Sequence, residues 1–583
     1  MKRLLIILFM ISSCFAGNMA ILGVKETTEG FLGLFATLEL EVVNGSGRVY
    51  FNTIPLAETD TQASARLAVE VACQTLEMNC NNKDFFYTIN TDSPMIGGPS
   101  AGAAMAILAM SELLNKPLYD NVAITGTINP DKSIGVVGGV VEKAKVLENS
   151  KFDTILIPAG TKYLFRNESL SVKIVEVSTI TEAFSYFSGI IFSEPSSVID
   201  KSGFNDFMKV MSEELISYSN LMFDDLIKKN VSSIVNASEY LEIEAAINYT
   251  LDDIKKMNEL YGLENYYSAS SYSVKVSINS LYLNYLADYL IGNFNLSEMV
   301  DEMNDSILEF EKKFDTSLLI DNANDFEAIS ISIERMFEAK ELLSLAADYM
   351  NNNDSYNALY NLAFAKVRLK TSESWFGLKD LLVGDYSYEF NQYDFRELAY
   401  TRIENAKTLL NYANSMQESY YTVSASELID KSYSAYLNGD IIYSLFESLK
   451  SISNSNLALS LAGINDENLN QRISLLMDLA AKNINSVTAK GIIPILAYSY
   501  YEYGQTLNES DTLDAVIFFE YSKQFSLLSE QLINEAIPKT ENENVNITAY
   551  LPSFAISLLI GIFFSLTVLE VYYESASLNK RKR

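Results

Sequence analysis

The sequence predicts a mixed α/β domain, then a large all-helical domain, then a single apolar segment near the C-terminus. Three observations support this. Up to about residue 190, short apolar strands alternate with amphipathic helices, and glycine is frequent. From residue 202 to 541 glycine is sparse and long amphipathic stretches follow one another. Residues 549–569 are apolar and uncharged, and a stretch of about 20 residues can cross a hydrocarbon core.

The periodicity of apolar residues predicts the elements of the first domain in order. Alternating apolar and polar residues indicate strands, and apolar residues three to four positions apart indicate helices. The predicted strands are residues 20–24, 33–43, 48–53, 85–89, 122–127, 134–137, 154–157 and 171–177. The predicted helices are residues 62–77, 100–115, 140–148 and 180–188.

Three stretches of the helical region share one shape, a helix that ends in a turn and is followed by a second helix. They span residues 341–368, 428–452 and 498–525, with turns expected at 351–354, 438–440 and 503–504. Such pairs resemble tetratricopeptide-type repeats, which bury their faces by stacking on neighbours. An irregular helical bundle is an equal alternative. The tyrosines at helical spacing are interpreted as packing residues.

Charge and composition exclude several classes of function. The 583 residues include 75 acidic and 43 basic side chains, and the net charge of −32 would repel a nucleic acid. The chain contains no histidine, which excludes Ser-His-Asp triads, Cys-His dyads and His-ligated zinc sites. No Gly-x-x-x-x-Gly-Lys-Ser/Thr loop occurs, so no ATPase motor is expected. We therefore expect no ATP requirement, no metal and no other cofactor.

Both ends of the chain carry membrane signals. Residues 1–16 have a basic start, a short apolar run and small residues up to Ala16, which is the order of a cleavable signal peptide. Lipid attachment at Cys14 is the alternative. The basic residues 580–583 follow the apolar segment and should stay cytoplasmic. The sequence therefore predicts a single-pass protein of the cell membrane, with its catalytic domain outside the cytoplasm.

These signals divide the chain into five predicted parts: a signal peptide (1–16), the α/β domain (17–192), the helical domain (193–545), a transmembrane helix (549–571) and a basic tail (572–583). Once the signal peptide, which contains Cys14, is cleaved off, Cys73 and Cys80 are the remaining cysteines, in a compartment where disulfides persist. We expect these two residues to form a disulfide.

A serine within a glycine-rich turn is the first candidate for chemistry. Ser100 lies in the run Gly-Gly-Pro-Ser-Ala-Gly-Ala-Ala at residues 97–104, directly before an apolar helix. Small neighbours let a substrate approach closely, and the N-terminus of a helix can stabilise a developing oxyanion. A purely structural or phosphate-binding turn is the alternative.

A lysine early in a later helix is the second candidate. Lys143 lies in the run Gly-Gly-Val-Val-Glu-Lys-Ala-Lys at residues 138–145, among apolar neighbours. In a chain without histidine, a serine can be activated by a lysine whose pKa is lowered by desolvation. Lys145 and Lys151 are interpreted as solvated surface charges.

Taken together, these motifs resemble the proteolytic domain of the Lon family in order and in spacing. The residues that carry the resemblance are Gly98-Pro99-Ser100-Ala101-Gly102, Thr125-Gly126-Thr127, and Gly138-Gly139 with Lys143 four positions on. The similarity covers roughly residues 20–190 and includes the hairpin at 41–48 and the helix at 63–73. It implies an endopeptidase with Ser100 as nucleophile and Lys143 as general base. It further implies oxyanion and orienting roles for Gly98, Pro99, Ala101 and Thr125, with Thr125 bonding the lysine.

The chain departs from the family pattern at three positions near these motifs. Gly97 stands where bacterial members usually carry an acid, Thr127 replaces the usual acid after Thr-Gly, and Val136 replaces a usual proline. These changes affect the conformation of the loop and its substrate subsites rather than the dyad. The ATPase module of Lon is missing, and the overall organisation resembles archaeal Lon-like serine proteases that have a signal peptide and no motor.

The predicted function is that of a membrane-anchored, ATP-independent serine endopeptidase acting on extracytoplasmic or membrane-associated polypeptides. A homo-oligomer is left open. The alternative is a non-catalytic binding or assembly protein in which a helical array acts beside a retired protease domain. A small-molecule kinase of related fold is a third interpretation, and the missing metal-ligand pattern weighs against it.

Overall fold

The computed structural model describes residues 17–27, 30–57, 59–193, 195–229, 237–317, 323–379, 388–389, 392–416, 418–461, 469–508, 512–535 and 537–538. Its N-terminal region contains a four-stranded sheet in the order β1-β2-β4-β3. The strands are β1 (Gly17–Thr27), β2 (Gly30–Asn44), β3 (Val49–Ala57) and β4 (Lys83–Ile96). β3 and β4 are parallel and are connected through α1 (Thr59–Thr75), whereas the other pairs are antiparallel.

A second, parallel sheet lies later in the same region, in the order β5-β8-β9. Its strands are β5 (Val122–Ile124), β8 (Thr154–Pro158) and β9 (Lys173–Val177), and a short antiparallel hairpin joins β6 (Thr127–Ile128) to β7 (Ile134–Gly135). The helices are α2 (Gly102–Leu114), α3 (Val140–Lys145) and α4 (Ile180–Ser188), with single 3₁₀ turns at Pro99–Ala101 and Lys162–Phe165. These alternating strands and helices match the mixed α/β fold that the sequence predicts.

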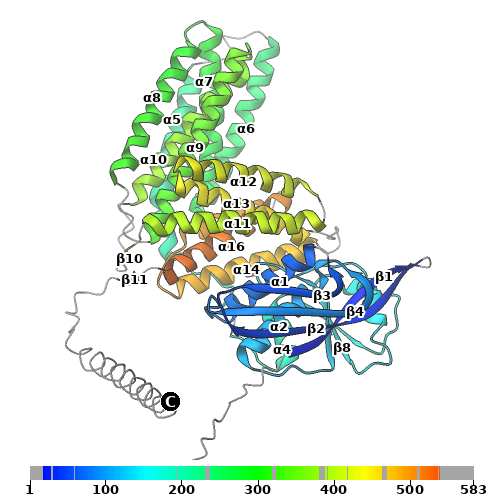
Figure 1. The fold of residues 1–583 in the computed structure, drawn as a ribbon. Helices are drawn as coiled ribbons and strands as arrows, with labels where there is room; N and C mark the ends of the chain where they lie inside the picture. The colour runs from blue at the N-terminus through cyan, green and yellow to red at the C-terminus, as the bar shows by residue number, and fades with distance from the viewer. Residues whose placement is uncertain are drawn as a thin grey trace, which may run out of the picture.

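The main core of this region lies between the four-stranded sheet and α1, α2 and α4 (Figure 1). Residues 102–111 of α2 are all buried, because this helix is apolar around its whole circumference. The Tyr87 hydroxyl of β4 donates a hydrogen bond to the carbonyl of Met105 at 2.8 Å, which satisfies a polar group inside the core. The helix that follows Ser100 is therefore firmly embedded.

The helical region begins at residue 202 and has two parts (Figure 1). Helices α5–α10 form an elongated bundle, and α11–α16 stack crosswise between that bundle and the sheets. The bundle consists of α5 (Ser202–Lys228), α6 (Ala237–Gly262), α7 (Tyr266–Leu290), α8 (Leu296–Ser317), α9 (Ala323–Asn351) and α10 (Ser355–Leu378). The stack consists of α11 (Gln392–Met416), α12 (Tyr420–Asn438), α13 (Ile441–Leu461), α14 (Leu469–Thr488), α15 (Ile495–Asn508) and α16 (Thr512–Glu535).

The three predicted helix–turn–helix pairs correspond to α9–α10, α12–α13 and α15–α16, and the helices of each pair pack against each other. The turn after α12 falls where expected, at Gly439, whose φ of 94° is a left-handed conformation that glycine adopts readily. The turn expected at 503–504 is wrong, because α15 continues through Gly504 to Asn508. A Cβ on Gly504 would lie 2.9 Å from the Phe519 ring, so this glycine lets two helices approach closely.

Two further expectations are corrected. The strand expected at 122–127 ends at Ile124. The Thr125 N–H still bonds to Leu156 of β8, but the Gly126 N–H and carbonyl bond to Ser100 and Ala103 instead. The expectation of an all-helical region is wrong for one short pair of strands, β10 (Tyr388–Glu389) and β11 (Ile537–Pro538). Tyr267, Tyr498 and Tyr500 are buried in the helical core, which confirms the interpretation of these tyrosines as packing residues.

The predicted membrane segments cannot be followed in the structure. The expected signal peptide at 1–16, the apolar segment at 549–571 and the tail at 572–583 all lie outside the described residues. Within the part of the chain that is described, no helix is both long enough and apolar enough to span a bilayer.

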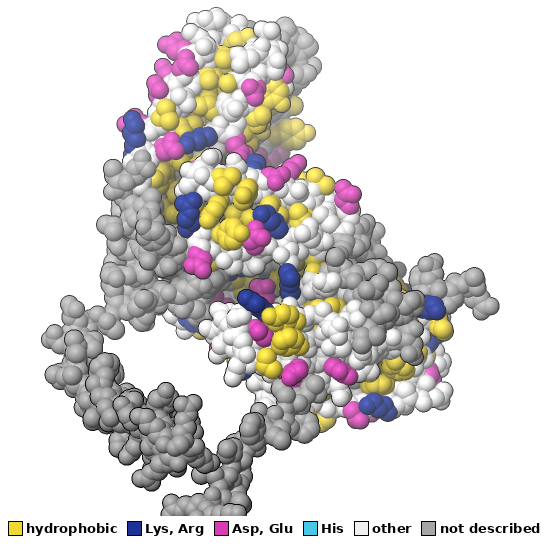
Figure 2. Space-filling view, in the orientation of Figure 1, with side chains coloured by type: hydrophobic (Ala, Val, Ile, Leu, Met, Phe, Trp, Pro, Cys, Tyr) yellow, Lys and Arg dark blue, Asp and Glu magenta, His cyan; other side chains and the backbone are white. Residues whose placement is uncertain are grey.

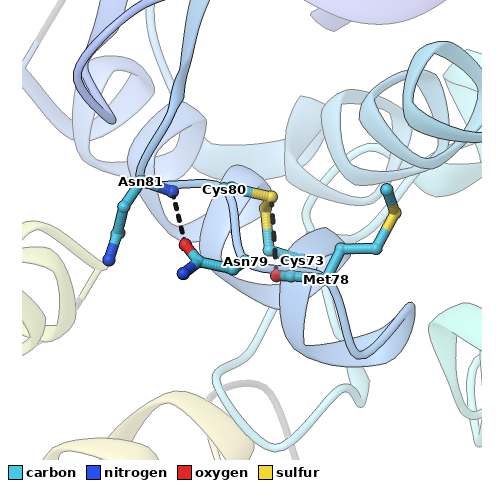
Figure 3. The surroundings of a disulfide bond; sticks show 5 residues. All are labelled: Cys73, Met78, Asn79, Cys80 and Asn81. Atoms are coloured by element: carbon cyan, nitrogen blue, oxygen red, sulfur yellow. Dashed lines mark hydrogen bonds between the residues drawn. A yellow bond between two sulfur atoms is a disulfide. The ribbon is translucent and has the colours of Figure 1, made fainter. Parts of the chain in front are cut away.

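Cys73 and Cys80 form a disulfide (Figure 3). Cys73 lies near the end of α1 and Cys80 in the loop that leads into β4, with their Cα atoms 6.2 Å apart. Within the same loop, the N–H of Asn81 donates to the side-chain oxygen of Asn79 at 2.9 Å. The covalent bond and this turn fix how α1 is connected to the sheet.

Candidate active site

Ser100 lies in a single 3₁₀ turn, Pro99–Ala101, that leads directly into α2. The sequence predicted a helix from residue 100, whereas the α-helix begins at Gly102. A Cβ on Gly102 would lie 2.6 Å from the Ser64 hydroxyl oxygen and 2.9 Å from the backbone nitrogen of Ile128. Glycine is therefore required for α2 to start this close to α1 and β6.

Two hydroxyl groups of α1 hold the backbone of the Ser100 turn. The Thr61 hydroxyl donates to the Gly98 carbonyl at 3.4 Å, and the Ser64 hydroxyl donates to the Pro99 carbonyl at 3.5 Å. Both side chains are buried, so these contacts are shielded from water. The sequence analysis missed these residues. The sequence offered one signal for them, which is two hydroxyl side chains three positions apart on an otherwise apolar helix face.

The segment after β5 connects the Ser100 turn to Lys143. The Gly126 N–H donates to the Ser100 carbonyl at 3.1 Å, and the Gly126 carbonyl accepts from the Ala103 N–H at 3.1 Å. The adjacent residue, Thr125, accepts a hydrogen bond from Lys143 Nζ at 3.2 Å. The residues that the sequence singled out from three separate motifs thus meet around Thr125–Gly126.

Lys143 is buried, with 2 % of its surface exposed. It lies on α3 beside buried Val140 and Ala144, and among the described residues no carboxylate forms an ion pair with it. Burial disfavours the charged ammonium and lowers the pKa of Lys143 to about 8. Lys145, two positions on, is exposed and pairs with Glu168 at 2.8 Å, as expected of a surface charge.

A lysine in this environment can act as a base near neutral pH. In the structure Lys143 donates to Thr125, and in the described part of the chain no hydrogen bond joins it to Ser100. Catalytic hydrogen bonds are often formed only once substrate is bound, so this resting contact is compatible with proton transfer. No group of three His, Cys, Asp or Glu side chains suited to a metal occurs among the described residues.

A buried ion cluster lies at the β6–β7 hairpin, close to the same site. The carboxylate of Asp131 accepts from the N–H of Ser133 at 2.9 Å and also accepts a hydrogen bond from Lys523 of α16. Lys523 also bonds Glu520 at 2.6 Å. Burial alone would raise the pKa of Asp131, but the positive charges of Lys523 and Arg472 outweigh it and lower this pKa to about 2. The hairpin beside the candidate site is therefore anchored to the helical stack.

The surface shows no concentration of positive charge on the face in Figure 2. Lys and Arg side chains are scattered among acidic and apolar ones there.

The α/β region thus carries a serine at the start of an embedded helix and a buried lysine that contacts the adjoining segment. A family model of the Lon protease (S16) C-terminal proteolytic domain matches residues 25–182. This part of the chain is therefore a Lon-type proteolytic domain.

Known Lon proteases are similar to the same part of the chain. The archaeal Lon protease of Methanocaldococcus jannaschii is 28 % identical over 143 residues, which are 24 % of this chain and 21 % of that protein. The Lon protease of Buchnera aphidicola from Acyrthosiphon pisum is 33 % identical over 148 residues, or 24 % of this chain and 18 % of that protein. Lon protease 2 of Bacillus subtilis is 26 % identical over 162 residues, which are 26 % of this chain and 29 % of that protein. The chain thus matches between about a fifth and a third of the length of these relatives.

Proposed function

We propose that this chain is an ATP-independent serine endopeptidase in which Ser100 and Lys143 form a catalytic dyad. The observation that carries the proposal is the buried Lys143, whose pKa is lowered to about 8. Its amine donates a hydrogen bond to Thr125, and the next residue, Gly126, bonds to the Ser100 carbonyl. The similarity to Lon proteases supports the assignment to proteolysis. The lack of an ATP-binding loop in the sequence supports ATP independence.

In the proposed mechanism, neutral Lys143 accepts the proton of the Ser100 hydroxyl as the serine oxygen attacks the scissile carbonyl. The resulting ammonium then donates this proton to the leaving amine, which yields an acyl-enzyme that water hydrolyses. The Gly98–Ala101 turn, at the start of α2, would stabilise the oxyanion through backbone N–H groups and the helix dipole. Thr125 would keep the amine oriented.

The proposal is tested by hydrolysis of casein and of a fluorogenic peptide by the full chain. Ser100→Ala and Lys143→Ala should each remove most turnover, and the double variant should be little worse than either, because groups acting as a unit are non-additive. In the wild-type protein, kcat/KM should rise as the pH passes about 8, since the neutral amine is the active form. Exposed Lys151→Ala is the control. Robust hydrolysis by Lys143→Ala would contradict the proposed dyad.

We further propose that the chain is anchored in the cell membrane with its catalytic domain outside the cytoplasm. The N-terminal signal pattern and the apolar segment with its basic flank support this orientation. The Cys73–Cys80 disulfide agrees with an oxidising compartment.

Protease added to intact cells tests this orientation. It should digest the catalytic domain and spare the tail at 572–583, because only the domain would be exposed outside. A digested tail beside a protected catalytic domain would mean the opposite orientation. Extracytoplasmic or membrane-tethered polypeptides would then no longer be the expected substrates.

A further inference from the structure

The first residue of β1, Gly17, lies against the end of α2, the helix that follows Ser100. A Cβ on Gly17 would lie 2.2 Å from Glu112 Oε1 and 3.1 Å from Leu108 Cδ1. The carboxylate of Glu112 thus occupies the space that a side chain would take at residue 17. With standard backbone dimensions, this places the Gly17 nitrogen within about 5 Å of the Glu112 carboxylate.

The register of the sheet shows which face of β1 meets Glu112. Gly17 is paired with Leu40 of β2, and Leu40 is fully buried in the core that the sheet shares with α1, α2 and α4. Residues paired across two antiparallel strands point to the same face of the sheet. Glu41, the next residue of β2, points to the opposite face and is exposed. Gly17 therefore meets Glu112 on the covered face of the sheet.

The carboxylate of Glu112 is held in unfavourable surroundings. It lies in the last turn of α2, where the negative end of the helix dipole disfavours a second negative charge. It is half-buried, and burial raises its pKa because the charged form loses hydration. In the described part of the chain, no lysine or arginine forms an ion pair with it. Two unfavourable influences therefore act on Glu112, and no basic side chain that the structure describes offsets them.

Removal of the signal peptide would supply a positive charge at this point. The sequence predicts cleavage after Ala16, which makes Gly17 the new N-terminus. A membrane signal peptidase would hydrolyse this peptide bond with one water molecule. The Ala16 carbonyl takes the oxygen and leaves as a carboxylate, and the Gly17 nitrogen becomes an α-ammonium, whose ordinary pKa is about 8. A neutral amide near Glu112 is thereby exchanged for a cation.

We propose that cleavage between Ala16 and Gly17 creates an N-terminal ammonium that forms an ion pair with Glu112 and ties β1 to the end of α2. The pair joins the first residue of the processed chain to the helix whose start follows Ser100. The inference rests on the proposed function, namely on the signal peptide that the proposed export requires. It assigns a processing site and the side chain that receives the new N-terminus.

The first measurement identifies the N-terminus. The full chain is expressed with residues 1–16 in a host that has a signal peptidase, extracted from membranes with detergent and analysed by mass spectrometry. The N-terminal peptide should begin with Gly17-Asn18-Met19. A protein that keeps residues 1–16, or that begins at a lipid-modified Cys14 or at any other residue, would overturn the processing site.

The second measurement tests the ion pair through thermal unfolding at pH 7. One protein begins at Gly17 and the other carries two additional alanines before Gly17. Both extend to residue 583 and are released from a fusion partner by a protease that leaves no residue of its own. The extension restores a neutral amide at Gly17 and moves the ammonium about 7 Å farther along the chain. The protein that begins at Gly17 should melt about 2–4 °C higher.

Matched variants assign this difference to Glu112. Glu112→Gln should abolish the difference between the two N-termini, because a neutral amide cannot form the pair. Glu41→Gln removes the same charge from the exposed, opposite face of the sheet and should leave the difference unchanged. Circular dichroism spectra verify that each variant is folded. Equal melting temperatures for the two N-termini, or a difference that Glu112→Gln leaves intact, would overturn the ion pair.

The outcomes separate this inference from the proposed activity and orientation. Hydrolysis of the fluorogenic peptide is measured on the same proteins, in which Ser100 and Lys143 are unchanged. Turnover without the ion pair leaves the dyad standing, and an inactive protein that begins at Gly17 leaves the processing site standing. A catalytic domain that is accessible outside intact cells but still carries residues 1–16 would remove only the processing site.

Discussion

At the scale of single residues, the burial of Lys143 has two effects: it costs folding stability, and it lowers the pKa of the amine. Its side chain is 2 % exposed, and burial lowers its pKa from the ordinary value of 10.5 to about 8. Below pH 8 the folded protein must hold a buried ammonium that the unfolded chain keeps in water. This penalty is largest below pH 8 and shrinks as the pH rises toward 10.5, where the unfolded chain also loses the proton.

We therefore expect Lys143→Met to stabilise the folded protein near pH 7. Removing the charge should recover about 2–3 kcal/mol, and losing the contact with Thr125 should cost about 1 kcal/mol, which leaves a net gain of about 1–2 kcal/mol. The measurement is thermal unfolding of both proteins between pH 6 and pH 10. The advantage of the variant should decrease above pH 8.

The control is Lys145→Met, which removes an exposed lysine of the same helix and should change the melting temperature little. A Lys143→Met protein that melts lower than wild type at pH 7 would show that this lysine contributes net stability, and the argument from burial would fail.

At the scale of elements, α15 and α16 depend on a close approach at Gly504. Gly504→Ala should destabilise the protein by about 1–3 kcal/mol, because the added methyl meets the Phe519 ring at 2.9 Å inside a packed core. Chemical denaturation measures the change. Gly377→Ala in α10 is the matched control, since nothing lies within 4 Å of its Cβ position. Equal effects at both positions would rule out the close approach as the cause.

The elements also show what the sequence could predict. The helix at 180–188 was predicted with the bounds observed for α4, because its apolar residues follow the helical period. In the structure Thr179 caps its N-terminus and Gly189 ends it. Long helices of the C-terminal region were predictable for the same reason. The break after Ile124 was not, because the Gly126 N–H bonds to the Ser100 turn rather than to a strand, and local pattern does not encode such a partner.

Some residues of the candidate site could likewise be singled out from the sequence, and others could not. Ser100, Lys143 and Thr125 belong to motifs whose residue types and spacing can be recognised in the sequence, and their catalytic roles stay predictions. Thr61 and Ser64 could not be singled out, because their hydroxyls are ordinary until α1 packs against the turn. Lys523 is 392 residues away from Asp131, and no periodicity connects positions so far apart.

At the scale of the whole molecule, the buried cluster around Asp131 joins the α/β region to the helical stack. Asp131→Asn should lower stability by about 3 kcal/mol, because it leaves the buried Lys523 and Arg472 with one negative partner fewer. Thermal unfolding of the full chain measures this change. Asp120→Asn is the control, because the pair of Asp120 with Lys151, at 3.4 Å, is exposed. A similar melting temperature for both variants would contradict the role of the cluster.

Helix α1 contacts both regions of the molecule. Ala63 and Leu67 on this helix pack against the core of α11–α13, whereas Thr61 and Ser64 hold the carbonyls of the Ser100 turn. A short rigid helix cannot shift at one face and stay still at the other. Any ligand that displaces the stack would therefore change how firmly the serine is held. Because linkage is reciprocal, a ligand bound at the Ser100 turn would alter the affinity of the stack for its own ligand by the same factor.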